Sequence, residues 1–140
     1  MSASTNTSRV LLLVVLSLAP GAASLAQTAN RPSGSLQDAA KALSAGNLDQ
    51  AELDLQSVLR VHPGDYRALD LLGVVRVLQH QEAQAEELFE QVLKAQPDFA
   101  PGHAHLGLLY MQMGREQDAL PELQQALRLD PSRSDVAGAL

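Results

Sequence analysis

The chain has 140 residues, no cysteine and a formal net charge of −6 at pH 7. The lack of cysteine excludes disulfide bonds, zinc–thiolate sites and thiol catalysis, and the acidic balance disfavours nucleic-acid phosphates and anionic lipid headgroups as partners. Almost half of the residues are apolar but only 3% are aromatic. The core therefore has to be aliphatic, which suits closely packed helices better than a β-sandwich.

The amino terminus has the order of a secretory signal peptide. Arg9 supplies a positive charge, residues 10–18 are almost all apolar, and residues 19–26 turn to small side chains. We predict cleavage between Ala26 and Gln27, a mature net charge of −7 after the loss of one cation, and a periplasmic or secreted location. The alternative is a retained membrane anchor, but the apolar run is about half of the ~20 residues that cross a bilayer. No stable membrane span is expected after cleavage.

Residues 27–34 are predicted to form a disordered, solvated lead-in because they have no periodic apolar face. A first helical hairpin follows. Apolar side chains recur at helical spacing over residues 36–43, and Gly46 can end that helix in the left-handed conformation. The second helix has its apolar stripe over residues 48–59 and stops before Pro63, which has no amide hydrogen.

Two further hairpins are predicted downstream, with helices at residues 66–79 and 82–95 and at residues 98–113 and 116–129. Asp65 is placed to cap the first of these helices, because its carboxylate can accept the free amide hydrogens of the first turn.

A seventh, short helix is predicted to begin within residues 132–140. An array of helical hairpins needs a last helix to cover its final apolar face. This segment is either such a minimal cap or a surface that docks onto something else.

The hairpins repeat with a period of 34 residues. Pro63, Pro97 and Pro131 are spaced by this number. Further columns in the same register are Gly73 and Gly107; Ala51, Ala85 and Ala119; Leu55, Phe89 and Leu123; and Leu59, Leu93 and Leu127. Such a period in a chain rich in helix formers indicates helix-turn-helix units that stack on one another.

The recurring glycine predicts a close contact between helices. A glycine in the middle of a helix costs about 1 kcal/mol relative to alanine, so its presence at both Gly73 and Gly107 suggests that another helix passes too near for a side chain. Ala39 stands at this place in the first hairpin. We expect the alanine column of the facing helix, Ala85 and Ala119, to supply the other half of the contact.

The segments LLGVVRVL…AEELFEQVLKAQPD and HLGLLYMQMG…ALPELQQALRLDP resemble the tetratricopeptide repeat family, and the resemblance covers about residues 35–133. It implies an all-α fold, an α-solenoid of three stacked helix-turn-helix repeats followed by a short C-terminal capping helix. The repeats would span about residues 32–65, 66–99 and 100–133, within a domain of residues 35–140. The resemblance is weakest in the first repeat, which lacks the family's large aromatic residue near its start.

The resemblance also implies a concave groove that is lined by the first helix of each repeat and holds extended or helical peptides. The positions carried over to this groove are Leu36, Ala40, Leu43, Arg67, Asp70, Leu71, Val74, Leu78, Pro101, His105, Leu108 and Met111. The set is mostly apolar, which suits an amphipathic helix or an apolar strand of a partner. Chaperone-adaptor members of the family hold a C-terminal carboxylate with lysine, asparagine and arginine. Here Leu36, Ala40, Leu71, Pro101 and His105 stand at those places, so we predict no carboxylate clamp.

These features predict a non-enzymatic scaffold that binds another protein, in a bacterial envelope or secretion assembly, without a cofactor or metal. The sequence shows no nucleophile beside a base and no glycine-rich phosphate loop. His103 and His105 would point about 200° apart on a helix and could not share a metal ion. The alternatives are a helical segment of a larger enzyme or translocation machine, and self-association through the groove as a homo-oligomer.

Overall fold

The computed structural model describes residues 34–140, in which α-helices are the only regular secondary structure. The helices are α3 (Leu36–Ser44), α4 (Leu48–Val61), α5 (Tyr66–Leu78), α6 (Glu82–Ala95), α7 (Ala100–Gln112), α8 (Glu116–Leu129) and α9 (Ser134–Ala137). The predicted signal peptide and nearly all of the predicted lead-in fall in residues 1–33, outside the described residues. None of the described helices is long and apolar enough to span a membrane.

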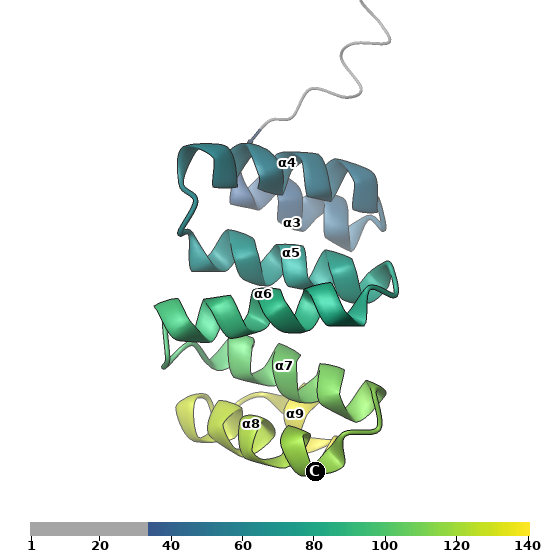
Figure 1. Cartoon of the computed structure of the whole chain (residues 1–140), viewed down its shortest axis with the longest axis vertical. Coiled ribbons are helices and arrows are strands. Elements are labelled where there is room, and N and C mark those ends of the chain that lie inside the picture. Colours follow the sequence, from purple (N-terminus) through teal and green to yellow (C-terminus); the bar gives the residue numbers. More distant parts are fainter. Residues whose placement is uncertain (1–33) are drawn as a thin grey trace, which may run out of the picture. The chain divides into compact units, whose positions relative to one another are not determined.

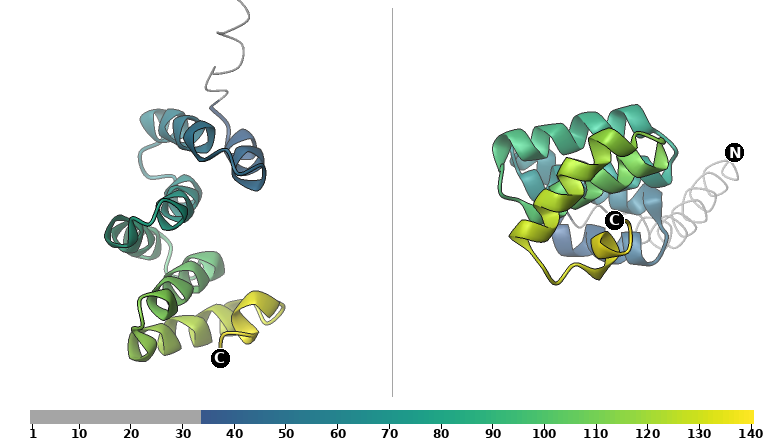
Figure 2. Two further views of the ribbon diagram at one scale, coloured as in Figure 1. Left: turned by 90° about the vertical axis from the view of Figure 1, so that its right-hand side faces the viewer. Right: turned by 90° about the horizontal axis from the view of Figure 1, so that it is seen from below.

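The six long helices form three antiparallel hairpins, α3–α4, α5–α6 and α7–α8, that stack in chain order (Figure 1). Seen from the side, α3, α5 and α7 follow one another along one face, and α4, α6 and α8 follow one another along the opposite face (Figure 2). Each hairpin packs on the next through its second helix and through the first helix of its successor. The predicted all-α solenoid of three hairpins is confirmed.

Local sequence signals set the helix ends. The Asp65 side chain accepts hydrogen bonds from the amides of Arg67 and Ala68 at 3.0 and 3.3 Å, which confirms the predicted cap of α5. Gly46 and Gly114 adopt φ angles of +74° and +73° directly after α3 and α7. Only glycine takes this conformation without strain, so both residues end their helices as sharp turns.

The start of α7 differs from the prediction, which placed it at residue 98. The helix begins at Ala100, and the capping place that corresponds to Asp65 is taken by Phe99, whose side chain makes no capping hydrogen bond. The Phe99 ring instead packs edge-on against Tyr66, with ring centroids 5.0 Å apart. Pro101 is tolerated in the first turn, because amide hydrogens there have no acceptor within the helix. At the C-terminus, α9 likewise covers only Ser134–Ala137 of the predicted segment.

The glycine column marks the closest approach within each hairpin, as predicted. A Cβ atom built on Gly73 would lie 2.4 Å from Cε1 of Phe89, and one on Gly107 would lie 2.6 Å from Cδ2 of Leu123. The neighbour was predicted wrongly, however: the atoms nearest to each glycine belong to the Phe89 and Leu123 column and not to Ala85 or Ala119. A large side chain fills the notch that the missing Cβ leaves, while the alanines are fully buried elsewhere in the core.

Charged side chains link successive hairpins. Arg76 on α5 donates to both carboxylate oxygens of Glu52 on α4, at 2.7 and 2.8 Å. This guanidinium holds the pKa of Glu52 below its usual value. One repeat later, Arg115 donates to Glu86 on α6 at 2.7 Å and stacks over the ring of Tyr110, with Cζ 4.3 Å from the centroid. Burial, followed by the hydrogen bond to Glu86, raises the pKa of Tyr110 to about 12.

The last hairpin is covered only in part. Val136 on α9 is fully buried and belongs to the same apolar cluster as Leu123 and Ala126 of α8. With four residues, α9 covers much less of α8 than the full-length α7 covers of α6. A second pocket therefore opens beside it, lined by Met111, Glu116, Leu120, Leu123, Ala139 and Leu140.

Candidate functional site

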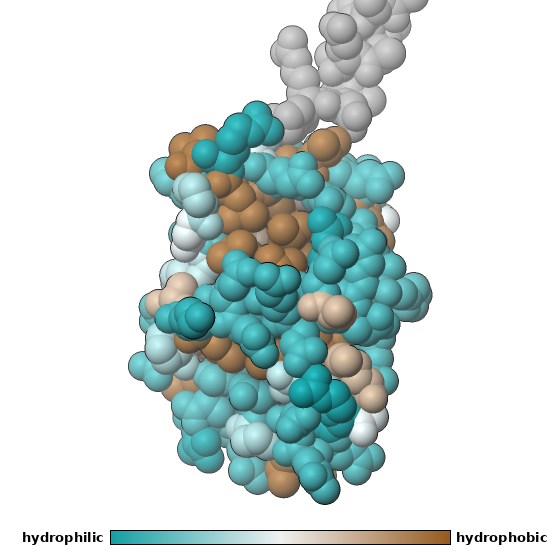
Figure 3. Space-filling view, viewed as in Figure 1, coloured by the Kyte–Doolittle hydropathy of each residue, from teal (hydrophilic) through white to brown (hydrophobic). Residues whose placement is uncertain are grey.

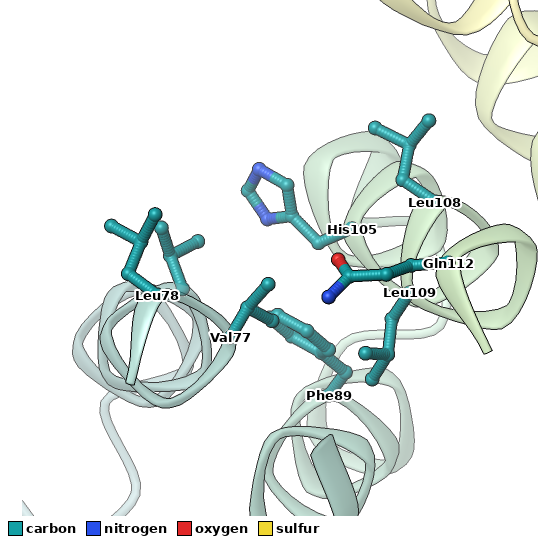
Figure 4. A pocket seen from close by; sticks show the side chains of 8 residues that line it. Val77, Leu78, Phe89, His105, Leu108, Leu109 and Gln112 are labelled. Atoms are coloured by element: carbon teal, nitrogen blue, oxygen red, sulfur yellow. The ribbon is translucent and has the colours of Figure 1, made fainter. Parts of the chain in front are cut away.

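An apolar pocket of about 180 Å³ opens between α5 and α7 on the face formed by the first helices of the hairpins. It is lined by Val74, Val77, Leu78, Phe89, His105, Leu108, Leu109 and Gln112. In Figure 4 the ring of Phe89 on α6 closes the bottom of this space, while Leu78 and Leu108 stand on its two sides. The pocket thus has mostly aliphatic walls and an aromatic floor.

Four of the predicted groove residues line this pocket: Val74, Leu78, His105 and Leu108. They come from the second and third hairpins, which brings together the two best-matching copies of the repeat. Because residues three or four apart share one helix face, the positions on α5 and α7 that the family resemblance implied meet across the gap between the two helices.

The other predicted groove residues do not line the pocket. On α3, Leu36 and Leu43 are half-buried and Ala40 is exposed. On α5, Arg67 is exposed, Asp70 is buried and Leu71 is half-buried. On α7, Pro101 lies at the start of the helix and Met111 at its end. Met111 instead lines the second pocket, near α9.

Val77, Leu109, Gln112 and above all Phe89 line the pocket without having been predicted as groove residues. Phe89 belongs to the repeated column of Leu55 and Leu123, and its side chain is fully buried. Its ring nevertheless lies against Gly73 and forms the floor of the pocket. The sequence held a signal for this, since Phe89 is the only aromatic residue in a column of leucines and faces a glycine.

A partly buried hydrogen bond ties α5 to α7 beside the pocket. Nδ1 of His105 lies 2.8 Å from Oδ1 of Asp70, whose exposed fraction is only 4%. As a carboxylate, Asp70 only accepts hydrogen bonds, so Nδ1 carries the hydrogen and donates it. The His105 ring also lies near that of Phe89, with centroids 5.6 Å apart. Asp70, predicted as a groove residue, thus acts beneath the surface by holding His105 in place.

His103 faces other partners. Its Nδ1 lies 2.6 Å from a carboxylate oxygen of Glu122 on α8, and its Nε2 lies 2.7 Å from the carbonyl oxygen of Pro97. The two histidines therefore serve different contacts, as their spacing on a helix predicts. Residues 34–140 contain no group of three or more acidic or histidine side chains that could hold a metal ion.

Comparison with known proteins places the chain in a family. The family model of the tetratricopeptide repeat matches residues 42–106 and again residues 76–140. The chain belongs to the tetratricopeptide repeat family, which confirms the resemblance seen in its sequence.

Two curated relatives are far longer than this chain. It is 33% identical over 85 residues to the probable UDP-N-acetylglucosamine–peptide N-acetylglucosaminyltransferase SPINDLY of Petunia hybrida, a match that covers 61% of this chain and 9% of that protein. It is 26% identical over 98 residues to the PEX5-related protein of Homo sapiens, covering 70% of this chain and 16% of that protein. The chain thus spans less than a fifth of either relative.

Solved structures support the same fold. An O-GlcNAc transferase of Thermobaculum terrenum superposes with a TM-score of 0.72 at 26% identity, covering 75% of this chain and 20% of that one. The first tetratricopeptide repeat domain of Spaghetti (RPAP3), bound to the HSP90 peptide SRMEEVD, gives a TM-score of 0.70 at 13% identity, covering 74% and 85%. At the latter identity the likeness establishes the fold alone.

Proposed function

We propose that the chain is a non-enzymatic scaffold that binds an apolar or amphipathic segment of another protein in the groove between α5 and α7. The observation that carries this proposal is the open pocket on that face, in which six of the eight lining side chains are apolar. Apolar side chains left open to water at the centre of a groove gain free energy when a partner covers them. Membership of the tetratricopeptide repeat family agrees with such a role.

The opposite face is less suited to an apolar partner. Figure 3 shows it as mostly hydrophilic, with an apolar area between α4 and α6. The hollow on this side is lined mainly by polar side chains, namely Leu72, Arg76, Gln84, Glu87, Leu88 and Gln91. The charged surface of α6 is thus the solvated side of the solenoid, and the groove on the other face is the better docking surface.

The test is a selection of random 12-residue peptides displayed on phage against the immobilised full chain. Wild type is compared with Leu108→Glu and Val74→Glu, which place a charge in the pocket, and with Leu53→Glu on α4, which places one at an exposed leucine elsewhere. We expect enrichment of binders on wild type and on Leu53→Glu, and none on the two pocket variants. Circular dichroism checks that all variants keep their helicity. Equal enrichment on all four proteins would refute groove binding.

We also propose that the scaffold works in a bacterial envelope or secretion assembly. This rests on the signal-peptide pattern of residues 1–26. Expression of the full chain in a Gram-negative host should yield a periplasmic product whose N-terminal residue is Gln27, as read by mass spectrometry. A cytoplasmic product that retains Met1 would refute this part of the proposal.

A second candidate is that the chain is the helical-repeat segment of a larger enzyme. It is favoured by the small share that the chain covers of SPINDLY, 9%, and of the Thermobaculum transferase, 20%. Genomic sequence downstream of the codon for Leu140 decides between the two. An in-frame continuation into further repeats or a transferase domain would support the larger enzyme, and a stop codon would support the scaffold. Light scattering at several concentrations tests self-association separately.

A further inference from the structure

We propose that the pocket between α5 and α7 selects an aromatic side chain that carries a hydrogen-bond donor, tryptophan or tyrosine, with Nε2 of His105 as the acceptor. This inference rests on the proposed function, since it names what the groove takes from its partner. It is drawn from the size of the pocket, the rings that line it and the fixed hydrogen-bonding role of His105.

The pocket has room for one ring. Its volume of about 180 Å³ is slightly larger than an engineered cavity of about 150 Å³ that binds benzene. Phe89 supplies its floor and His105 part of its wall, with the two rings 5.6 Å apart and tilted by 36°. A ring that enters between Leu78 and Leu108 would find an aromatic floor and an aromatic part of the wall, and contacts between aromatic rings add to the free energy gained from buried area. An aliphatic side chain would fill the space without these contacts.

The hydrogen bond from Asp70 decides which nitrogen of His105 remains available. Because Nδ1 donates its hydrogen to the buried carboxylate, the neutral ring has its lone pair at Nε2, which is then an acceptor only. Within residues 34–140 no group donates to Nε2. In Figure 4 the second ring nitrogen of His105 points toward the open side of the groove, between Leu78 and Leu108. A partner group that meets this atom must bring an N–H or O–H.

The remaining polar group in the pocket does not select in the same way. Gln112 is the only other polar side chain among the lining residues, and its amide can both donate and accept. It therefore tolerates either kind of partner atom. The fixed acceptor on His105, held by a carboxylate with an exposed fraction of only 4%, is the group that distinguishes tryptophan and tyrosine from phenylalanine and leucine.

The phage selection described above gives the first test, carried out at about pH 8, where a histidine ring is mostly neutral. Among peptides selected on wild type, we expect tryptophan or tyrosine to dominate at one position. On His105→Phe, which keeps a ring but has no acceptor, phenylalanine and leucine should become as frequent as tryptophan and tyrosine at that peptide position. Enrichment of phenylalanine or leucine on wild type would overturn this inference and leave groove binding intact. A lack of any enrichment would refute the proposed function itself.

Matched synthetic peptides measure the effect. The best selected peptide is compared by calorimetry with a copy in which tryptophan is replaced by naphthylalanine, or tyrosine by phenylalanine. We expect the copy to bind wild type about threefold to tenfold more weakly, which corresponds to one net hydrogen bond. It should bind His105→Phe as well as the parent peptide does. Equal affinity of the two peptides for wild type would overturn the inference.

The role of Asp70 has a readout that needs no ligand. Long-range ¹H–¹⁵N spectra of the full chain should show the His105 ring protonated at Nδ1 and bare at Nε2 at about pH 8. Asp70→Asn, whose amide can also donate, should populate the other tautomer and reduce the preference for the donor-bearing peptide. A wild-type ring protonated at Nε2, or an undiminished preference in Asp70→Asn, would show that Asp70 does not set the acceptor.

Discussion

The second and third hairpins share one backbone arrangement and differ at a few side chains that decide what each can bind. In both, a glycine of the first helix leaves a notch that a large side chain of the second helix fills, Phe89 against Gly73 and Leu123 against Gly107. The phenylalanine ring is wide enough to reach the groove and form its floor. Leucine at the same place contributes instead to the pocket beside α9. One residue in a repeated column thus determines where an aromatic-lined pocket forms.

The contacts that join the hairpins differ in the same manner. Glu52 and Glu86 are 34 residues apart, and each binds an arginine of the following hairpin. The arginine comes from the last turn of α5 in one case, as Arg76, and from the N-cap of α8 in the other, as Arg115. The 34-residue period thus keeps the glutamate at equivalent positions of two hairpins, but the arginine that binds it comes from different helices. At the third equivalent place stands Leu120, which is 48% exposed.

The largest expected effect tests the closeness of the glycine contact. Gly107→Leu should lower the free energy of unfolding by about 1–3 kcal/mol through overpacking, because its Cβ alone would lie within 2.6 Å of Leu123. Gly64→Ala is the control, since within residues 34–140 no atom beyond its chain neighbours lies within 4 Å of a Cβ at that place. Thermal unfolding measured by circular dichroism compares the two. A Gly107→Leu protein that melts at the wild-type temperature would show that the helices can separate without cost.

A second variant removes a difference between the hairpins. Pro121 lies inside α8 at the place of Glu87 in α6 and breaks one hydrogen bond of the helix. Pro121→Ala should therefore raise the free energy of unfolding by up to about 3 kcal/mol, the cost of proline relative to alanine inside a helix. Glu87→Ala, a helix former replaced by a better one at the equivalent place, should change it little. Urea unfolding of the three proteins gives the comparison, and no gain from Pro121→Ala would contradict the account.

The junction between the first two hairpins predicts a dependence on pH. Because Arg76 lowers the pKa of Glu52, the pair stabilises the fold above the usual glutamate pKa of 4.5, and this contribution is lost as the pH falls through the lowered value. Arg76→Met should cost about 1 kcal/mol near pH 7 and less in acid. Arg128→Met serves as control, because within the described residues the Arg128 guanidinium bonds only Gln125 of its own helix. If Arg76→Met lowered the free energy of unfolding equally near pH 7 and in acid, the ion pair of Arg76 and Glu52 would not account for the loss.

The smallest effect concerns the second junction. In Tyr66→Phe, Tyr110 is the only remaining tyrosine, and its phenol should ionise at about pH 12, compared with an ordinary value of 10.0. Since the folded pKa is raised, the stability that this group contributes below pH 10 is lost as the pH rises towards 12. Ultraviolet absorbance follows the ionisation. Glu86→Gln should bring the pKa of Tyr110 back towards 10.0. An unchanged pKa in this variant would show that Glu86 does not contribute to the shift.

Much of the fold could be predicted from local sequence signals. The bounds of α6 and α8 agree with the prediction to the residue, because their apolar stripes and flanking turns are sharp. The start of α7 was misplaced by two residues, since Phe99 occupies the capping place without a capping hydrogen bond and packs on Tyr66. The candidate site was found in part: the resemblance to the repeat family pointed to residues on α5 and α7 that line the pocket, but not to the floor that Phe89 supplies from α6.

By itself, the sequence determined the class of fold and the three hairpins, because a 34-residue period places side chains of one kind at equivalent positions of successive hairpins. The face of the groove was implied by the resemblance to the repeat family. Only the tertiary structure decided which of those residues meet in one pocket, that Phe89 rather than an alanine faces Gly73, and that Asp70 holds His105. The physical reason is that periodicity shows which positions recur on successive hairpins, but not which side chains meet between two helices. Contacts between helices depend on the size of the side chains that fill the space between them.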